Sequence, residues 1–245
     1  MVCIHGLAQD HRMWTHVQDE LVELQTFAYD VRGHGATTLG RADGTLAQLG
    51  RDLIAFLEAH GAAMCVGFSL GGTVALWAAA ERPDLVTSVV AIATSSVVGR
   101  TAAAGLEQRI RLFETGDAAA VCEAVRADTV MQLAEPDPQR VDAIERSRLA
   151  AIGDRAGYLN GARAMLGMHA EPLNARLARI TVPVHVIGAE HDRVCPRRAA
   201  EIMLEHLPDA TFEELLGIGH LVTDEDPDAV TAAIRNRTTD HQEAG

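Results

Sequence analysis

The sequence predicts an α/β protein built on a mostly parallel, doubly wound sheet. Short apolar runs alternate along the chain with longer segments whose apolar residues recur at helical spacing. The apolar runs lack alternating polar residues, which is typical of parallel strands covered on both faces. Strands that alternate with helices favour right-handed crossovers within one sheet. The length of 245 residues fits one domain with an insertion, because a domain takes about 150 residues.

Six strands and four helices account for most of the chain outside that insertion. The strands are expected at residues 2–4, 26–30, 63–68, 85–93, 184–188 and 211–214. The helices, whose apolar residues form a stripe or cover the whole surface, are expected at residues 10–24, 47–60, 70–80 and 227–237. Residues 238–245 are polar and are expected to fray.

Residues 100–170 interrupt the alternation of strands and helices. They contain no convincing strand and are rich in Ala, Arg and Glu. Breaks that combine Gly, Pro and Asp divide them into three or four helices. We therefore expect a discontinuous α/β core from residues 1–99 and 171–245. A helical cap of residues 100–170 would be inserted between the fourth and fifth strands.

The charged residues exclude several classes of function. All 21 basic residues are Arg, so chemistry that needs a lysine Schiff base, a lysine general base or a P-loop lysine is excluded. The 34 acidic residues bring the net charge to -13. Such acidity argues against a surface that binds nucleic acid through its phosphates.

Cysteines and apolar stretches give no sign of a metal knuckle, a leader or a membrane span. The four cysteines are far apart and form no C-x-x-C pair. The first residues lack the basic and long apolar regions of a signal peptide, so a cytoplasmic protein is expected. Residues 61–80 are uncharged and long enough to cross a bilayer. Their glycine-rich middle instead predicts a strand, a sharp turn and a helix, so no membrane partner is expected.

Ser69 lies in a motif that suits a catalytic nucleophile. Gly67-Phe68-Ser69-Leu70-Gly71 has the form G-x-S-x-G and sits between an apolar strand and an apolar helix, where a nucleophile elbow must sit. Such a turn holds the serine in a strained conformation with its hydroxyl exposed. The small residues on either side let neighbouring backbone approach, and the helix N-terminus directs backbone N–H groups at the reacting oxygen.

A catalytic serine requires a base, and the base requires an acid that orients it. His220 follows the last strand and Asp192 follows the fifth. Both lie, like Ser69, at the carboxyl ends of parallel strands, where open α/β sheets build their sites. Glu190 competes with Asp192, but a strand end presents only one of the two, and we favour Asp192.

Three other histidines are expected near the same edge of the sheet, namely His5, His34 and His191. We favour packing or hydrogen-bonding roles for them, and His220 as the base. A metal site from His5, Asp10 and His11 fits no known spacing of ligands. The sequence therefore predicts no metal and no cofactor.

Five motifs, in order along the chain, resemble those of the α/β-hydrolase superfamily over essentially the whole length. They are His5-Gly6-Leu7, residues 30–35, the Ser69 turn, residues 188–192 with Pro196, and Gly219-His220. The order Ser69, Asp192, His220 is also that superfamily's triad order. Within the superfamily, three phrases look most like the branch of 3-oxoadipate enol-lactonases and cofactor-free haloperoxidases and esterases. They lie at residues 5–10, 67–72 and 179–183.

The resemblance implies a role for each residue in the α/β-hydrolase fold. Ser69 attacks an acyl carbonyl, His220 takes its proton and later protonates the leaving group, and Asp192 holds the imidazole tautomer. The backbone N–H groups of Leu7 and Leu70 form the oxyanion hole.

The N-terminus departs from the family pattern. Most relatives carry a hairpin of two strands before the strand that ends in His-Gly, and here that strand begins at Val2. The sheet then has about six strands, and the strand at residues 26–30 becomes an edge. Because an uncovered apolar edge favours association, we expect either a partner subunit, as in a homodimer, or the first helix to cover it.

The predicted function is hydrolysis of a small carboxylic ester or lactone through an acyl-enzyme. Two alternatives stay open: a C–C hydrolase of a β-diketone or vinylogous substrate, and a small-ligand receptor on a hydrolase scaffold. Candidate substrate contacts are Trp14, Tyr158 and Met165. Arg111 or Arg163 is a candidate partner for a substrate carboxylate.

Overall fold

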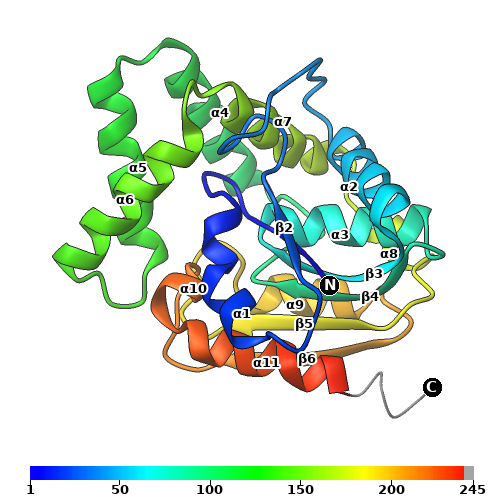
Figure 1. Cartoon of the computed structure of the whole chain (residues 1–245). Coiled ribbons are helices and arrows are strands. Elements are labelled where there is room, and N and C mark those ends of the chain that lie inside the picture. The colour runs from blue at the N-terminus through cyan, green and yellow to red at the C-terminus, as the bar shows by residue number, and fades with distance from the viewer. Residues whose placement is uncertain (240–245) are drawn as a thin grey trace.

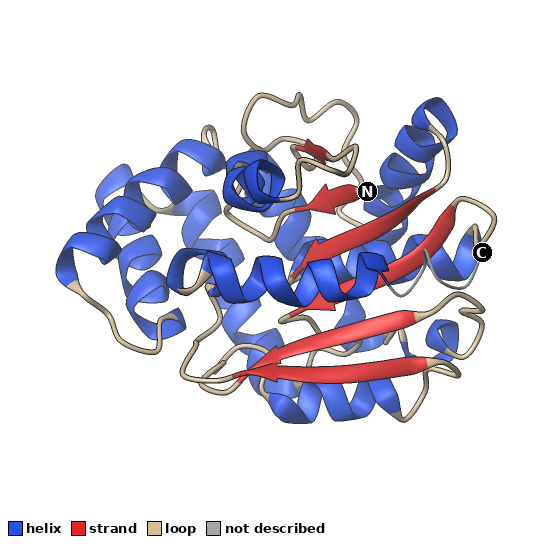
Figure 2. Ribbon diagram, turned by 60° about the horizontal axis from the view of Figure 1, so that its bottom comes forward, coloured by secondary structure: helices blue, strands red, loops and turns tan. Residues whose placement is uncertain are grey.

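The computed structural model describes residues 1–239, and its centre is a single six-stranded sheet. The strand order is β2-β1-β3-β4-β5-β6, and every neighbouring pair is parallel. The predicted parallel sheet is therefore confirmed, and Figure 2 shows its twist. The strands are β1 (Val2–Ile4), β2 (Phe27–Tyr29), β3 (Ala63–Phe68), β4 (Val86–Ile92), β5 (Val184–Ala189) and β6 (Ala210–Leu215).

Helices cover both faces of this sheet, and each face has its own apolar core (Figure 1). One core includes α2 (Leu46–His60), α3 (Leu70–Glu81), α8 (Asn174–Leu177) and α9 (Arg197–Leu204). The other includes the 3-10 helix η1 (His11–Trp14), α1 (Thr15–Glu20), α10 (Val222–Glu225) and α11 (Pro227–Thr239). Successive strand residues alternate between the cores, as Cys65 and Val66 do, so the strands are apolar throughout.

The uncharged stretch at residues 61–80 folds as predicted into strand β3, a turn and helix α3. Helix α3 is buried on nearly all sides, because the sheet lies on one face and α2 on another. Within residues 1–239, none of the helices combines the length and apolar character needed to cross a membrane.

Four helices fill residues 100–170, between β4 and β5, and are called the helical segment below. They are α4 (Arg100–Thr115), α5 (Ala118–Gln132), α6 (Pro138–Ile152) and α7 (Ala156–Ala170). Asp117 and Asp137 cap α5 and α6 with their side chains, as the breaks in the sequence indicated. Helix α7 lies against the loop after β2, where a side chain at Gly33 or Gly157 would collide with the other glycine's backbone. Treating this segment as a separate cap domain stays a prediction.

The first helix is shorter than predicted for residues 10–24. The Asp10 side chain accepts a hydrogen bond from the Arg12 N–H, and Thr15 bonds back to the Arg12 carbonyl, so the chain begins with the tighter turn η1. The α-helix that follows ends at Glu20. Leu21 leaves the helical conformation and is fully buried in the second core.

The ends of the chain and its short helices also differ from the prediction. Helices α8, α9 and α10 left no clear pattern in the sequence because each spans only one or two turns. Helix α11 continues through Thr239, so the fraying expected from residue 238 onward is wrong for residues 238 and 239. Residues 240–245 lie outside the described part of the chain.

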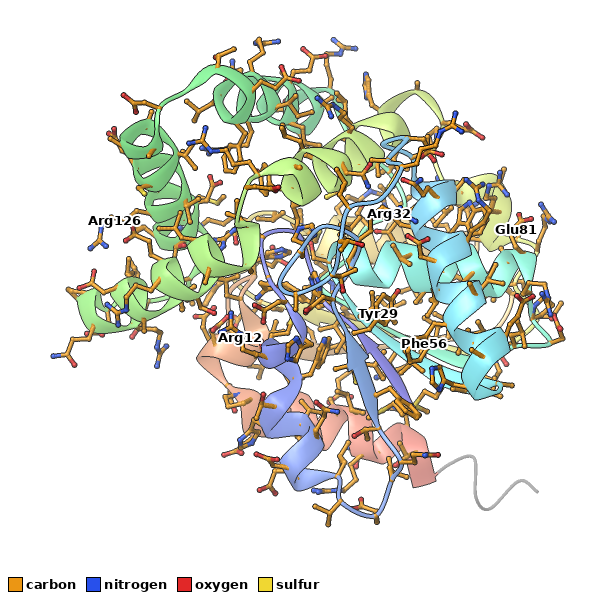
Figure 3. All side chains as sticks on the ribbon, turned by 45° about the horizontal axis from the view of Figure 1, so that its top comes forward. Arg12, Tyr29, Arg32, Phe56, Glu81 and Arg126 are labelled. Carbon is orange, nitrogen blue, oxygen red and sulfur yellow. The ribbon has the colours of Figure 1, made fainter. Side chains whose placement is uncertain are left out.

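Strand β2 forms one edge of the sheet, as predicted. Its Phe27 and Tyr29 side chains pack against Phe56 of α2, with Tyr29 stacked at 5.3 Å between ring centroids (Figure 3). Beyond the strand, the Asp30 carboxylate accepts the backbone N–H of His11, which ties the start of η1 to this edge. The homodimer that would cover the outer side of β2 stays a prediction.

Candidate active site

Ser69 occupies a strained turn between β3 and α3. Its backbone has φ 49° and ψ -115°, a conformation that costs about 1–3 kcal/mol for a residue with a side chain. The glycines of the motif are required by close approach. A Cβ on Gly67 would lie 2.3 Å from the carbonyl oxygen of Gly71, and one on Gly71 would lie 2.1 Å from that of Ile4. Both glycines of the motif are therefore needed because no side chain fits at either position.

The Ser69 backbone is held in this conformation from two sides. Its N–H donates to the Ile92 carbonyl at 2.9 Å. Its carbonyl accepts the Thr94 hydroxyl at 2.6 Å and the Thr73 N–H at 3.2 Å. These bonds come from β4, the loop after it and α3, so the surrounding sheet and helix offset the local strain.

His220 and Asp192 form a buried pair at the ends of β5 and β6. The His220 Nδ1 lies 2.8 Å from the Asp192 Oδ2. The other oxygen of Asp192 accepts the N–H groups of Val194 and Cys195 at 2.7 and 2.8 Å, which fixes the carboxylate. With Nδ1 donating to Asp192, the neutral imidazole keeps its Nε2 as an acceptor. Ser69 and His220 line the same cavity, which is the arrangement a nucleophile and its base require.

Glu190 has a different position from Asp192. Its carboxylate accepts the Gly217 N–H at 2.8 Å near the surface and so links the loop after β5 to the loop after β6. The structure thus brings Asp192, and not Glu190, to His220.

The two segments expected to supply the oxyanion hole converge beside Ser69. Leu7 follows β1 and lines the cavity. Leu70 is the first residue of α3, so its N–H has no acceptor within the helix. Their side chains meet above Gly161 of α7, where a Cβ would lie 2.9 Å from Leu7 and 3.1 Å from Leu70.

Known proteins share this combination of fold and site. A family model described as alpha/beta hydrolase fold matches residues 1–227. The chain belongs to the α/β-hydrolase family. This confirms the fold class and the resemblance read from the five motifs.

Relatives of this hydrolase include enzymes of the predicted branch. It is 27% identical over 242 residues to 3-oxoadipate enol-lactonase 2 of Acinetobacter baylyi. The matched region covers 96% of this chain and 86% of that protein. It is 28% identical over 248 residues to 2-(acetamidomethylene)succinate hydrolase of Mesorhizobium japonicum, with the same coverage. The crystal structure of an enol-lactonase from Burkholderia xenovorans has the same fold. It superposes with a TM-score of 0.84 at 23% identity, covering 97% of this chain and 90% of that one.

The cavity of this hydrolase measures about 230 Å³ and lies between the sheet and the helical segment. Tyr158 and Met165 of α7, two of the candidate substrate contacts, line it. Trp14 does not reach it, because its side chain is fully buried in the core that contains α1 and α11. The other apolar lining residues are Leu7, Phe68, Leu106, Met131, Val194 and Leu221.

The two arginines proposed for a substrate carboxylate lie elsewhere on the hydrolase. Arg111 is an exposed partner of Glu107 on α4, at 3.8 Å, and Arg163 is an exposed partner of Glu114, at 2.6 Å. Neither lines the cavity. Two arginines that the sequence did not single out, Arg109 and Arg148, line it instead.

His5 and His34 pack and form hydrogen bonds, as expected, whereas within residues 1–239 the side chain of His191 does not. His5 is fully buried, with its Nδ1 2.7 Å from the Gly6 carbonyl and its Nε2 accepting the Val31 N–H at 2.7 Å. His34 lies edge-on to it, with ring centroids 5.2 Å apart. Burial lowers the pKa of His5 to about 3 and also lowers the pKa of His34. His191 is largely exposed.

Asp10, His11 and Asp30 bring their ligand atoms within 4.8 Å of one another, but their polar groups already have partners. Asp10 accepts the guanidinium of Arg12, and one Asp30 oxygen accepts from His11. Arg12 and the hydrogen bonds to its side chain and backbone hold the pKa of Asp10 below its usual value. The group is therefore explained as a brace between η1 and the end of β2. His5 is not part of it.

Proposed function

We propose that this protein hydrolyses a small carboxylic ester or lactone through an acyl-serine intermediate. The observation that carries the proposal is the shared cavity of Ser69 and His220, with Asp192 held against the far side of the imidazole. This is the nucleophile, base and orienting acid of a serine hydrolase. The names of the two relatives, a lactonase and a hydrolase, support the same reaction class.

The chemistry follows from the positions of these groups. The Ser69 oxygen attacks the acyl carbonyl while His220 Nε2 takes the hydroxyl proton, and Asp192 stabilises the imidazolium that forms. The N–H groups of Leu7 and Leu70 would hold the negative oxygen of the tetrahedral intermediate, an interaction worth about 3 kcal/mol per donor. The intermediate collapses when His220 passes its proton to the departing alkoxide. Water then attacks the acyl-serine, with His220 again as the base, and releases the acid and free Ser69.

The cavity limits the size of the substrate. Its volume of about 230 Å³ is below the range of about 300–1,000 Å³ that is usual for drug-sized ligands. Apolar side chains form much of the wall, and Gln9 adds a buried side-chain oxygen without a hydrogen-bond partner. A short acyl chain or a single small ring fits these dimensions.

The experiment compares the wild type with Ser69→Ala on p-nitrophenyl acetate and with a fluorophosphonate probe. We expect the wild type to turn over the ester and to be labelled at Ser69. The variant should do neither while keeping its circular dichroism spectrum and melting temperature. A variant that retains the activity would refute Ser69 as the nucleophile. A wild type that is neither active nor labelled would favour the receptor alternative. Product analysis with a dienoate substrate separates ester hydrolysis from C–C cleavage.

A further inference from the structure

The cavity contains two arginines but one carboxylate outside the triad. Arg109 of α4 donates to Asp128 of α5 at 2.5 Å, and both side chains line the cavity. Arg148 of α6 lines it as well, on the same side as α5. The Arg109–Asp128 pair is neutral, so the charge of Arg148 is left without a paired counter-charge.

Arg148 is deeply buried and incompletely hydrogen-bonded. Only 6% of the residue is exposed. Its Nη1 donates to the Thr129 hydroxyl at 3.0 Å, while its Nε has no hydrogen-bond partner. Among residues 1–239, no carboxylate forms an ion pair with it. Asp128 and Asp224 attract it only from a longer range. Because Thr129 takes Nη1 and Nε is closed off from solvent, Nη2 is the nitrogen that remains for a ligand in the cavity.

Burying an unpaired, incompletely hydrogen-bonded guanidinium costs free energy unless an anion pairs with it. Arginine does not lose its proton in proteins, so it cannot escape the cost by becoming neutral. Burial of an unpaired charge is strongly unfavourable, and proteins retain such charges mainly in ion pairs or in functional sites. An N–H group of a guanidinium forms a strong, charge-assisted hydrogen bond with a carboxylate oxygen. Thr129 holds the guanidinium in place before any ligand arrives.

We propose that Arg148 binds a carboxylate of the substrate, so that this hydrolase acts on esters or lactones whose acyl part carries a second, free carboxylate. The inference rests on the proposed function, because it names the substrate class of the same cavity. Ser69 would take the acyl carbonyl at one wall while Arg148 takes the free carboxylate at another. The small volume then selects short diacid derivatives over long ones.

The test uses two methyl esters of equal chain length that differ by one carboxylate, monomethyl succinate and methyl butyrate, followed in a pH-stat. For the wild type we expect a higher kcat/KM on monomethyl succinate. In Arg148→Met, the ratio of the two kcat/KM values should fall about 10- to 100-fold, the usual effect of losing charge-assisted hydrogen bonds. Arg148→Lys keeps the charge but replaces the planar guanidinium with an ammonium group, so its ratio should lie between those of the wild type and Arg148→Met.

Arg111→Gln is the matched control, since it removes one positive charge from the helical segment at an exposed site away from the cavity. Its ratio should equal that of the wild type, which separates a local contact from a general effect of net charge. An unchanged ratio in Arg148→Met, with normal turnover of methyl butyrate, would overturn the proposal. If Arg148→Met does not fold, Arg148→Lys provides the same comparison, and an unchanged ratio there also overturns it.

A binding measurement separates this proposal from the proposed function. Calorimetry with succinate on Ser69→Ala should show binding that is lost in Ser69→Ala/Arg148→Met. If the wild type shows no esterase activity but succinate binding still depends on Arg148, the carboxylate site is supported while the hydrolase mechanism fails. Esterase activity together with succinate binding that ignores Arg148 would support the mechanism and overturn the carboxylate site.

Discussion

His5 links two loops of the fold only while it is neutral. Its Nε2 accepts the Val31 N–H and its Nδ1 lies 2.7 Å from the Gly6 carbonyl, so the proton must sit on Nδ1. A second proton on Nε2 would face the Val31 N–H and break that hydrogen bond. The side chain is fully buried, with His34 against it, and burial lowers its pKa to about 3.

The lowered pKa predicts how stability depends on pH. In the unfolded chain His5 titrates near 6.5, its ordinary value. Between pH 6.5 and about 3, the unfolded state therefore binds a proton that the folded state does not. The free energy of unfolding must then fall as the pH falls through this window. At pH 5, the loss from His5 alone is about 2 kcal/mol.

Urea unfolding at pH 7.5 and pH 5.0 measures this loss, in the wild type and in His5→Gln. The glutamine oxygen can accept the Val31 N–H and does not titrate, so the variant should lose about 2 kcal/mol less between the two pH values. His206→Gln is the control, because His206 is exposed and its replacement should leave the wild-type pH dependence unchanged. Equal losses in the wild type and His5→Gln would refute the reasoning.

Two further predictions concern the groups around His220. Asp192→Asn should lower kcat by about 10⁴-fold with the fold intact, because the amide no longer selects the Nδ1–H tautomer. Glu190→Gln should leave kcat within a few-fold, since the Glu190 carboxylate accepts the Gly217 N–H and lies 4.0 Å from His191 but does not pair with His220. Steady-state kinetics on one ester compares the two variants. Glu225→Gln should cost about 1–3 kcal/mol of stability in urea unfolding. The carboxylate accepts two backbone N–H groups there and an amide can accept only one of them. An unchanged free energy of unfolding would show that the two hydrogen bonds from Ala134 and Gly219 to Glu225 do not stabilise the fold.

The sheet and the grouping of Ser69, Asp192 and His220 at one of its edges could be predicted because local sequence determines them. Each strand is an apolar run ended by a turn, and parallel strands place their carboxyl ends at one edge of the sheet. Ser69, Asp192 and His220 each follow such a run, so their meeting follows from topology alone. The spacing of a strand end indicated that only one of Asp192 and Glu190 would face the site, and the hydrogen bond to His220 shows that it is Asp192.

The cavity wall could not be predicted, because it depends on how helices rotate and pack. Trp14 has the spacing of a core residue and lies in the core, yet the same spacing at Tyr158 leads to the cavity. Arg148 looks like any of the 21 arginines in the sequence. What distinguishes it is burial against Thr129, a contact between α5 and α6 that no local pattern encodes.

Helix α5 contacts both Arg148, the proposed carboxylate partner, and His220, the proposed base. Thr129 and Asp128, which hold the two arginines, lie on its last turns. One turn later, the carbonyl of Gln132 accepts the backbone N–H of His220 at 2.7 Å. The position of the base therefore depends on the same helix that supports Arg148. If a substrate carboxylate pairs with Arg148 as proposed, it would compensate the charge next to this helix and help to hold α5 in the position from which Gln132 bonds His220. Binding energy from the distant end of the substrate would then act on the reacting end, so removing the carboxylate should lower kcat as well as raise KM.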